Sequence, residues 1–242
     1  KMRKQAERFE TRFINEDVKS VDFSKIPYSI TTETHTLVAQ SVIVATGASA
    51  MWLNLESEQR LRGKGVSACA VCDGFFFKGK NVAVVGGGDT AMREVNYLSK
   101  ICSKVTVIHR RDALKAQSAL QELVKSKPNV DFIWNSEVIE VLGQDKLTGV
   151  KLKNTQSGQV SELQLDGLFI AIGHKPNTDF LKEQINLDEK GYVVIHDETR
   201  TSVEGVFAAG DVSDYHYRQA VTAAGMGCKA VFDAEEYLEN LK

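Results

Sequence analysis

The sequence predicts an α/β fold in which buried parallel strands alternate with helices, and three observations predict it. Apolar runs at 81–85 and 105–108 have the length of buried strands, with an amphipathic helix between them. A glycine-rich turn at 86–91 joins the first strand to that helix and completes a βαβ unit. A further buried strand with a small-residue turn, 42–48, is echoed by 168–174. We therefore expect two Rossmann-like domains of three layers (ββα).

Composition and charge exclude several classes of protein. The net charge of −2 gives no broad attraction to nucleic acid or to a membrane surface. No apolar run approaches the ~20 residues needed to span a bilayer, and no signal-peptide pattern follows the charged start. Of the four cysteines, only two are close together, which argues against a disulfide-stapled secreted scaffold. We expect a cytoplasmic protein with neither nucleic acid nor membrane as partner.

The first part of the chain reads as an incomplete domain. Residues 1–13 are expected to be the end of a helix that runs into a strand, and 42–48 is the buried strand of the echo. Its counterpart at 168–174 is preceded by a full glycine-rich βαβ unit, whereas 42–48 is not, and Lys1 is no initiator Met. We expect that about 60 residues with another glycine-rich turn precede Lys1 in the intact protein.

The rest of the chain alternates short elements. A second helix is expected over 113–125, with Pro128 beyond its end. A long helix is expected at the C-terminus, over 220–241. Short strands are expected at 130–134, 138–141, 149–153, 168–172, 192–195 and 205–209.

The glycine-rich turn is a candidate pyrophosphate site. Gly86 permits a tight turn, Gly88 lets the backbone approach a phosphate, and Ala91 allows the helix to pack closely on the strand. The N-terminus of the following helix supplies N–H donors and a positive dipole. A packing turn in a non-binding domain is the alternative. The candidate residues are Gly86, Gly87, Gly88, Asp89, Thr90 and Ala91.

The next strand ends in His109, Arg110 and Arg111. A dinucleotide site usually has an acidic residue near this point for the ribose 2′-hydroxyl, whereas cations accommodate a 2′-phosphate. Alone, the triplet could be a solvated basic strand end. Following the glycine-rich turn at the expected separation, it favours NADPH.

Cys69 and Cys72 form an isolated C-x-x-C, followed by Asp73 and Gly74. Two thiols at this spacing can close a disulfide and exchange electron pairs. Structural zinc needs two more paired ligands, and neither Cys102 nor Cys228 has a second cysteine near it. Two inert buried cysteines are the other alternative. We expect redox chemistry and no metal.

A final motif lies near the C-terminus. A strand ends in Gly210-Asp211, which places one carboxylate at a glycine-lined edge. Arg218, Gln219 and Ala220 then lead into a helix whose N-terminus can face a group that gains negative charge, such as a reduced flavin. An ordinary strand, loop and packing helix would read the same way.

Together these residues resemble the low-molecular-weight thioredoxin reductases, over essentially the whole chain. Cys69-Ala-Val-Cys72-Asp73-Gly74 resembles the redox motif of that family, and the turn at 86–91 with 109–111 resembles its NADPH site. The segments that resemble its FAD contacts are Thr46, Gly47 and Ala48, Gly210 and Asp211, and Arg218, Gln219 and Ala220.

The resemblance implies a homodimeric flavoprotein that uses FAD and NADPH, with thioredoxin as the protein substrate. It implies a split FAD domain, 1–56 and 186–242, that lacks its N-terminal βαβ unit here, and an inserted NADPH domain, 57–185, with the redox centre. Electrons would pass from NADPH through FAD to the Cys69–Cys72 disulfide and on to thioredoxin. Cys72 would face the flavin, Cys69 would attack the partner disulfide, and Asp73 would act as general acid or base. Because the Cys69–Cys72 pair must meet both the flavin and the partner protein, the resemblance also implies a domain rotation between two states.

Two other functions stay open. The reductase component of an alkyl hydroperoxide system would share the fold and cofactors, with an extra thioredoxin-like region before Lys1. A non-catalytic nucleotide-binding fragment is the other, and a protein that truly lacks the opening FAD segment would be inactive. The intact cysteines and the His-Arg-Arg triplet argue against a fragment that has lost its function. The Ala-Val between the cysteines favours a thioredoxin-disulfide reductase over the hydroperoxide reductase component.

Overall fold

The computed structural model describes residues 1–241, which form two compact units. The split unit comprises Lys1–Ser49 and Lys175–Lys242, and the inserted unit comprises Ala50–His174. The chain passes from one unit to the other twice, at β5 (Ala48–Ala50) and at β14 (His174–Pro176). The predicted fold class is confirmed. The predicted domain limits, at residues 56 and 185, remain a prediction.

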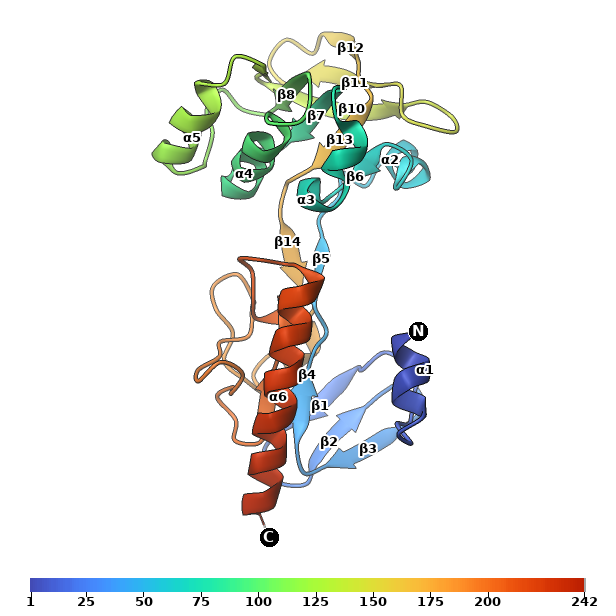
Figure 1. Ribbon diagram of the computed structural model, residues 1–242, viewed down its shortest axis with the longest axis vertical. Helices are drawn as coiled ribbons and strands as arrows, with labels where there is room; N and C mark the ends of the chain where they lie inside the picture. Colours follow the sequence, from blue (N-terminus) through green and yellow to red (C-terminus); the bar gives the residue numbers. More distant parts are fainter. Residues whose placement is uncertain (242) are drawn as a thin grey trace. The chain divides into compact units, whose positions relative to one another are not determined.

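The inserted unit is built on a five-stranded parallel sheet (Figure 1). Its central strand is β7 (Asn81–Val85), whose side chains alternate between two cores. Val82 and Val84 pack toward one face of the sheet, and Ala83 and Val85 pack toward the other. Both faces are covered, so the strand is apolar throughout, as expected for a parallel sheet. In sheet order, the strands are β6 (Val66–Ser67), β13 (Gly167–Ile170), β7 (Asn81–Val85), β8 (Lys104–Ile108) and β9 (Val130–Ile133).

Helices cover one face of this sheet and a second sheet covers the other, which gives the three predicted layers. The helical face carries α3 (Ala70–Asp73), α4 (Asp89–Leu98) and α5 (Ser118–Lys125), with the short 3₁₀ helix η1 (Gly74–Phe77) after α3. The opposite face carries α2 (Glu56–Leu61) and an antiparallel sheet of β10 (Ser136–Leu142), β11 (Gly149–Asn154) and β12 (Val160–Gln164).

The split unit combines an antiparallel sheet with a parallel pair. The antiparallel sheet is formed by β1 (Ser20–Asp22), β2 (Tyr28–Thr31) and β3 (Thr36–Ala39). The parallel pair is β4 (Val42–Val44) with β15 (Val206–Ala208), and the long helix α6 (Ala220–Asn240) packs on it. Phe207 faces α6, whereas Val206 and Ala208 face the core under the antiparallel sheet. The remaining elements are α1 (Met2–Glu7), η2 (Asp179–Leu181) and η3 (Gly210–Val212).

Three predicted elements are wrong in extent or kind. The helix expected from residue 113 begins at Ser118. The backbone N–H groups just before it are already used, because those of Lys115 and Ala116 donate to the Gly87 carbonyl at 2.7 and 3.1 Å. No strand follows α1 within residues 8–13.

The strand expected over 192–195 is absent from the described structure, apart from an isolated bridge between Leu187 and Val193. The reason lies in the backbone donors of this segment. Val193 N–H donates to the Val212 carbonyl, while Val194 N–H donates to the Asn186 carbonyl. Successive groups are satisfied by different segments, so no continuous ladder forms.

Among the helices of residues 1–241, none has the length and apolarity to cross a membrane.

Candidate redox and cofactor sites

The two clustered cysteines of the inserted unit are joined in a disulfide. Cys69 is the N-cap of α3 and Cys72 lies within that helix, where the N–H of Cys72 donates to Sγ of Cys69 at 3.2 Å. Cys72 is exposed and Cys69 is half-buried. A backbone N–H directed at a sulfur stabilises the thiolate there once the disulfide opens. The hydrogen bond therefore favours Cys69 as the thiolate of the reduced pair.

The other cysteines stand apart as free thiols. Cys228 is exposed on α6, and Cys102 is buried beneath α4. Burial raises the pKa of the Cys102 thiol to about 11, which keeps it protonated near neutral pH. Within residues 1–241, no three His, Cys, Asp or Glu side chains come together as a metal site.

Asp73 is tied to the disulfide loop through Ser67, a residue that the sequence analysis did not single out. The Ser67 hydroxyl donates to Oδ2 of Asp73 at 2.6 Å, and it accepts the N–H of Cys69 at 3.0 Å. Ser67 is the last residue of β6 and is buried. A serine two positions before the first cysteine, at a strand end, was the available signal. Its meaning depends on the return of the chain at Asp73.

The glycine-rich turn has the geometry expected of a phosphate site. At Gly86, φ is +152°, and a Cβ would lie 2.4 Å from the Ala171 carbonyl oxygen and 2.8 Å from Cβ of Ala91. At Gly88, by contrast, a Cβ would meet no atom within 4 Å. Gly88 is also the N-cap of α4, and as a glycine it has no side chain to cover the N–H groups of the first turn. The turn is thus closed toward the sheet and open at the helix N-terminus.

Asp89 and Thr90 follow in the first turn of α4. Oδ1 of Asp89 accepts the N–H of Gln117 at 2.8 Å, which holds the loop before α5 against the start of α4. Gly87 supports the same loop through its carbonyl oxygen. Ala91 is fully buried between α4 and the sheet. The six predicted residues are therefore contiguous at one edge of the sheet, and Asp89 has a structural partner there.

His109, Arg110 and Arg111 lie together at the carboxyl end of β8, with different surroundings. The two arginines are exposed. The His109 ring is buried, and its Nε2–H donates to the Ala113 carbonyl at 3.0 Å. Burial lowers the pKa of His109, the Ala113 hydrogen bond opposes that shift, and the nearby arginines add to it. His109 is thus a neutral, packed ring beside two solvated cations.

In the split unit, Asn177 holds the predicted segment at 46–48. Its side-chain amide donates to the Thr46 carbonyl at 2.9 Å, and its N–H donates to the Gly47 carbonyl at 2.9 Å. The Thr46 hydroxyl donates back to the Asn177 carbonyl at 2.8 Å. Gly47 has φ of +68°, with open space where a Cβ would stand, and Ala48 begins β5. Asn177 was missed in the sequence because its partners lie far away along the chain.

The second predicted segment of the split unit lies between β15 and α6. Gly210 has φ of +79°, and a Cβ there would lie 3.2 Å from that of Ala223 on α6. Burial raises the pKa of Asp211. Arg218 has φ of +50°, Gln219 is the N-cap of α6 without a side-chain cap hydrogen bond, and Ala220 begins the helix.

A sequence model of the family described as pyridine nucleotide-disulphide oxidoreductase matches residues 2–227. The chain belongs to this family. A glycine-rich turn and a closed C-x-x-C disulfide in one α/β unit agree with both halves of the family's description.

Individual members of the family match closely. The thioredoxin reductase of Streptomyces coelicolor is 50% identical over 99% of this chain and 75% of its own length. The solved thioredoxin reductase of Giardia duodenalis is 44% identical, with a TM-score of 0.92 over 98% of this chain and 79% of its own. A glucosaminate ammonia-lyase of Pseudomonas fluorescens is 47% identical over all of this chain and 78% of its own.

Membership in the pyridine nucleotide-disulphide oxidoreductase family implies nicotinamide and flavin cofactors. The inserted unit fits the nicotinamide dinucleotide, because the turn is open at Gly88 and two exposed arginines follow at the next strand. The split unit fits part of a flavin site. Gly47 leaves open space, and Gln219 leaves the N-terminus of α6 without a side-chain cap.

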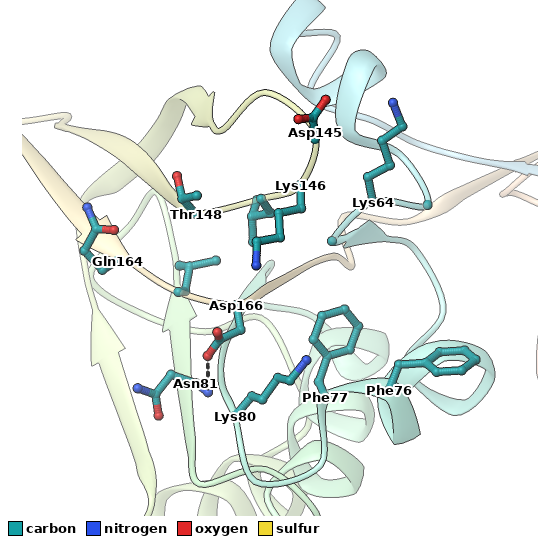
Figure 2. A pocket seen from close by; sticks show the side chains of 14 residues that line it. Lys64, Phe76, Phe77, Lys80, Asn81, Asp145, Lys146, Thr148, Gln164 and Asp166 are labelled. Atoms are coloured by element: carbon teal, nitrogen blue, oxygen red, sulfur yellow. Dashed lines mark hydrogen bonds between the residues drawn. The ribbon is translucent and has the colours of Figure 1, made fainter.

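The inserted unit also contains a hollow of about 610 Å³ (Figure 2). Lys80 and Lys146 point their amines toward its interior, and Asp166 accepts the N–H of Asn81 at 3.0 Å. None of the residues that line it was predicted as a site residue. They are Gly63, Lys64, Gly65, Phe76, Phe77, Lys80, Asn81, Asp145, Lys146, Leu147, Thr148, Gln164, Leu165 and Asp166.

Proposed function

We propose that this chain is the greater part of an NADPH-dependent thioredoxin-disulfide reductase. The observation that carries the proposal is the Cys69–Cys72 disulfide. Sγ of Cys69 accepts the Cys72 N–H, and the adjoining Asp73 accepts a hydrogen bond from Ser67. The nicotinamide and the flavin, when bound, supply the electron pair that opens this disulfide. The reduced cysteines then pass that pair to the partner.

The exchange with thioredoxin requires both cysteines. The Cys69 thiolate attacks one sulfur of the partner disulfide, forms a mixed disulfide and releases a partner thiolate. Cys72 then attacks the Cys69 sulfur, which restores the Cys69–Cys72 bond and releases the second partner thiolate. Two electrons and two protons leave the cysteine pair, and the partner gains two thiols. We assign the attacking role to Cys69 because its sulfur accepts the Cys72 N–H.

Asp73 is our candidate general acid and base. A carboxylate next to the second cysteine can take the proton from a cysteine thiol as it becomes a thiolate, and can return it to a leaving thiolate. The side chain is half-buried and already hydrogen-bonded to Ser67, so its orientation is restricted.

We assign the nicotinamide dinucleotide to Gly86, Gly87, Gly88, Asp89, Thr90 and Ala91, with His109, Arg110 and Arg111. The open backbone at Gly88 supports close approach of the pyrophosphate. Exposed guanidinium groups at 110 and 111 support a 2′-phosphate and hence NADPH. The buried His109 ring packs beside Gly87 and supports the turn, whereas Arg110 and Arg111 are exposed.

We assign FAD to Thr46, Gly47 and Ala48, to Gly210 and Asp211, and to Arg218, Gln219 and Ala220. In this proposal the FAD-binding parts are 1–56 and 186–242, and the NADPH-binding part is 57–185. A cytoplasmic homodimer with thioredoxin as its protein substrate completes the proposal.

The relative described as an ammonia-lyase gives the main alternative, alongside the alkyl hydroperoxide reductase component. Elimination of ammonia passes no electrons to a disulfide, so the Cys69–Cys72 pair favours the reductase. The test is anaerobic titration of the purified flavin-loaded protein with NADPH, then addition of oxidised thioredoxin. We expect the flavin absorbance to bleach and then return with stoichiometric thioredoxin thiols. Bleaching without reoxidation by thioredoxin would contradict the proposed substrate.

A further inference from the structure

We propose that Ser67 is a positioning residue for proton transfer at the Cys69–Cys72 pair, an assignment that rests on the proposed reductase function. Its hydroxyl connects the Asp73 carboxylate to the backbone of Cys69 through two hydrogen bonds. The proton-transfer group and the attacking cysteine are thereby held by one side chain.

The backbone of Ser67 is itself firmly placed. It is the last residue of β6 and pairs in parallel register with Phe169 of β13, a fully buried core residue. The Ser67 side chain is buried as well, so water does not compete freely for its hydroxyl. The serine therefore anchors the disulfide loop to the five-stranded sheet.

The hydroxyl of Ser67 uses its hydrogen-bonding capacity on this loop. A serine hydroxyl has one donor proton and two acceptor lone pairs. The proton can go to Oδ2 of Asp73 at 2.6 Å or to the Cys69 carbonyl at 3.5 Å. The short contact with a carboxylate is the stronger one, because charge-assisted hydrogen bonds are shorter and stronger. One lone pair accepts the Cys69 N–H at 3.0 Å.

Neither of these two hydrogen bonds involves a sulfur atom. Opening the disulfide therefore leaves the link from Asp73 through Ser67 to Cys69 in place. The carboxylate keeps its orientation toward the loop in both redox states, which general acid–base catalysis requires. A serine that only stabilised the turn would need the Cys69 contact alone.

The experiment introduces Ser67→Ala into the wild-type protein and into the Asp73→Asn variant, using the full flavin-loaded protein. Flavin reduction by NADPH and reduction of thioredoxin by the pre-reduced enzyme are followed separately by stopped flow. We expect Ser67→Ala to slow thioredoxin reduction on the order of 10- to 100-fold, as for a misplaced catalytic group. The rate of flavin reduction and the KM for thioredoxin should change less than about 2-fold, because neither depends on this proton transfer.

The decisive comparison is with Asp73→Asn, where the acid–base group is gone. Adding Ser67→Ala to Asp73→Asn should change the rate less than about 2-fold, since residues that act as a unit are not additive. Ser67→Thr should retain most of the rate because it keeps the hydroxyl. Ser136→Ala is the matched control, a buried serine of the same unit whose hydroxyl donates to the Trp134 carbonyl.

Two outcomes would overturn the proposal. One is an unchanged rate in Ser67→Ala, and the other is an equal slowing by Ser67→Ala in both backgrounds, which would mean a structural role. If Ser67→Ala does not fold, Ser67→Thr is compared with the wild type instead. A Ser67→Thr protein that reduces thioredoxin as slowly as Asp73→Asn would refute the positioning role. Failure of the wild type itself to reduce thioredoxin would instead refute the proposed function.

Discussion

In the inserted unit, the imidazole ring of His109 occupies the space directly beside Cα of Gly87. A Cβ on Gly87 would lie 2.3 Å from Cε1 and 2.5 Å from Nδ1 of that ring. The ring is fixed on its other side by the hydrogen bond from Nε2 to the Ala113 carbonyl. The first residue of the His-Arg-Arg triplet therefore supports the glycine-rich turn by packing, in addition to anything it contributes to a cofactor.

Gly87→Ala should lower the free energy of unfolding by about 1–3 kcal/mol, because a methyl group cannot enter this packed space without displacement. His109→Ala removes the obstacle. We therefore expect Gly87→Ala to cost measurably less in the His109→Ala background, with a coupling energy of about 1–2 kcal/mol. Urea unfolding of the four proteins measures the cycle. Strict additivity would show that the ring can move aside.

Gly88→Ala should weaken the binding of NADPH and leave the stability of the protein nearly unchanged. Apart from the adjoining backbone, no atom would lie within 4 Å of a Cβ at Gly88, and its φ of −97° is open to alanine. Loss of the preferred N-cap and the gain from a stiffer unfolded chain oppose each other, so the free energy of unfolding should change by less than about 1 kcal/mol. The methyl group would block close approach of a pyrophosphate. We expect the KM for NADPH to rise at least about 10-fold. An unchanged KM would refute the proposal that the pyrophosphate binds at this turn.

His109 should make the protein less stable as the pH falls below 6.5. Burial lowers its folded pKa below its ordinary value of 6.5. Below pH 6.5 the unfolded chain then binds more protons than the folded one, so the free energy of unfolding decreases as the pH falls through the folded pKa. Its stabilising contribution is complete above pH 6.5. The surrounding cations Arg110, Arg111 and Lys115 act in the same direction.

The measurement is urea unfolding at several pH values between 5 and 8, for the wild type and His109→Gln. The variant should have a flatter pH profile. His196 is the control, because its hydrogen bond with Asp197 raises its pKa and its contribution is lost as the pH rises. His196→Gln should therefore alter the profile in the opposite sense. A His109→Gln profile that parallels the wild type would exclude His109 as the cause.

The sequence predicts best where neighbouring residues decide the structure. The βαβ unit around Gly86 follows from strand periodicity, a turn that needs glycine and a good helix, all within 28 residues, 81–108. The Cys69–Cys72 disulfide likewise joins residues three positions apart. In the split unit, α6 begins at Ala220 as expected.

Residues whose role depends on distant partners could not be found in the same way. Asn177 holds the turn at Thr46, which is 131 residues away. Ser67 gains its role only because the chain returns at Asp73. The late start of α5 has the same origin, since Gly87 and Asp89 capture the N–H groups that precede it. Local propensity contains none of this information.

Arg110 and Arg111 should determine the choice between NADPH and NADH. Both guanidinium groups are exposed at the carboxyl end of β8, and a charge-assisted hydrogen bond contributes about 1.5–3 kcal/mol. Each arginine replaced by alanine should therefore lower kcat/KM for NADPH on the order of 10- to 100-fold, with little change for NADH. Lys100→Ala, which removes an exposed cation after α4, is the control. Equal losses for both cofactors would assign the arginines a structural role.

The cysteines should have unequal roles, which trapping with thioredoxin can distinguish. All variants carry Cys228→Ser, because this exposed free thiol could cross-link on its own, whereas Cys102 is buried with a raised pKa. Cys72→Ser leaves the Cys69 thiolate to attack and removes the group that would resolve the mixed disulfide. We expect this variant alone to accumulate a covalent complex on non-reducing gels. Its serine keeps the backbone N–H that Cys69 Sγ accepts.

Either Cys→Ser change should abolish turnover with thioredoxin and leave flavin reduction by NADPH within about 2-fold, because hydride transfer precedes the disulfide step. Two features of the structure favour opposite outcomes: Cys72 is the more exposed of the two cysteines, whereas the Cys69 sulfur accepts the stabilising N–H of Cys72. If exposure decided the role, Cys69→Ser would trap the complex instead. Turnover that survived in the double variant would refute the cysteine relay itself.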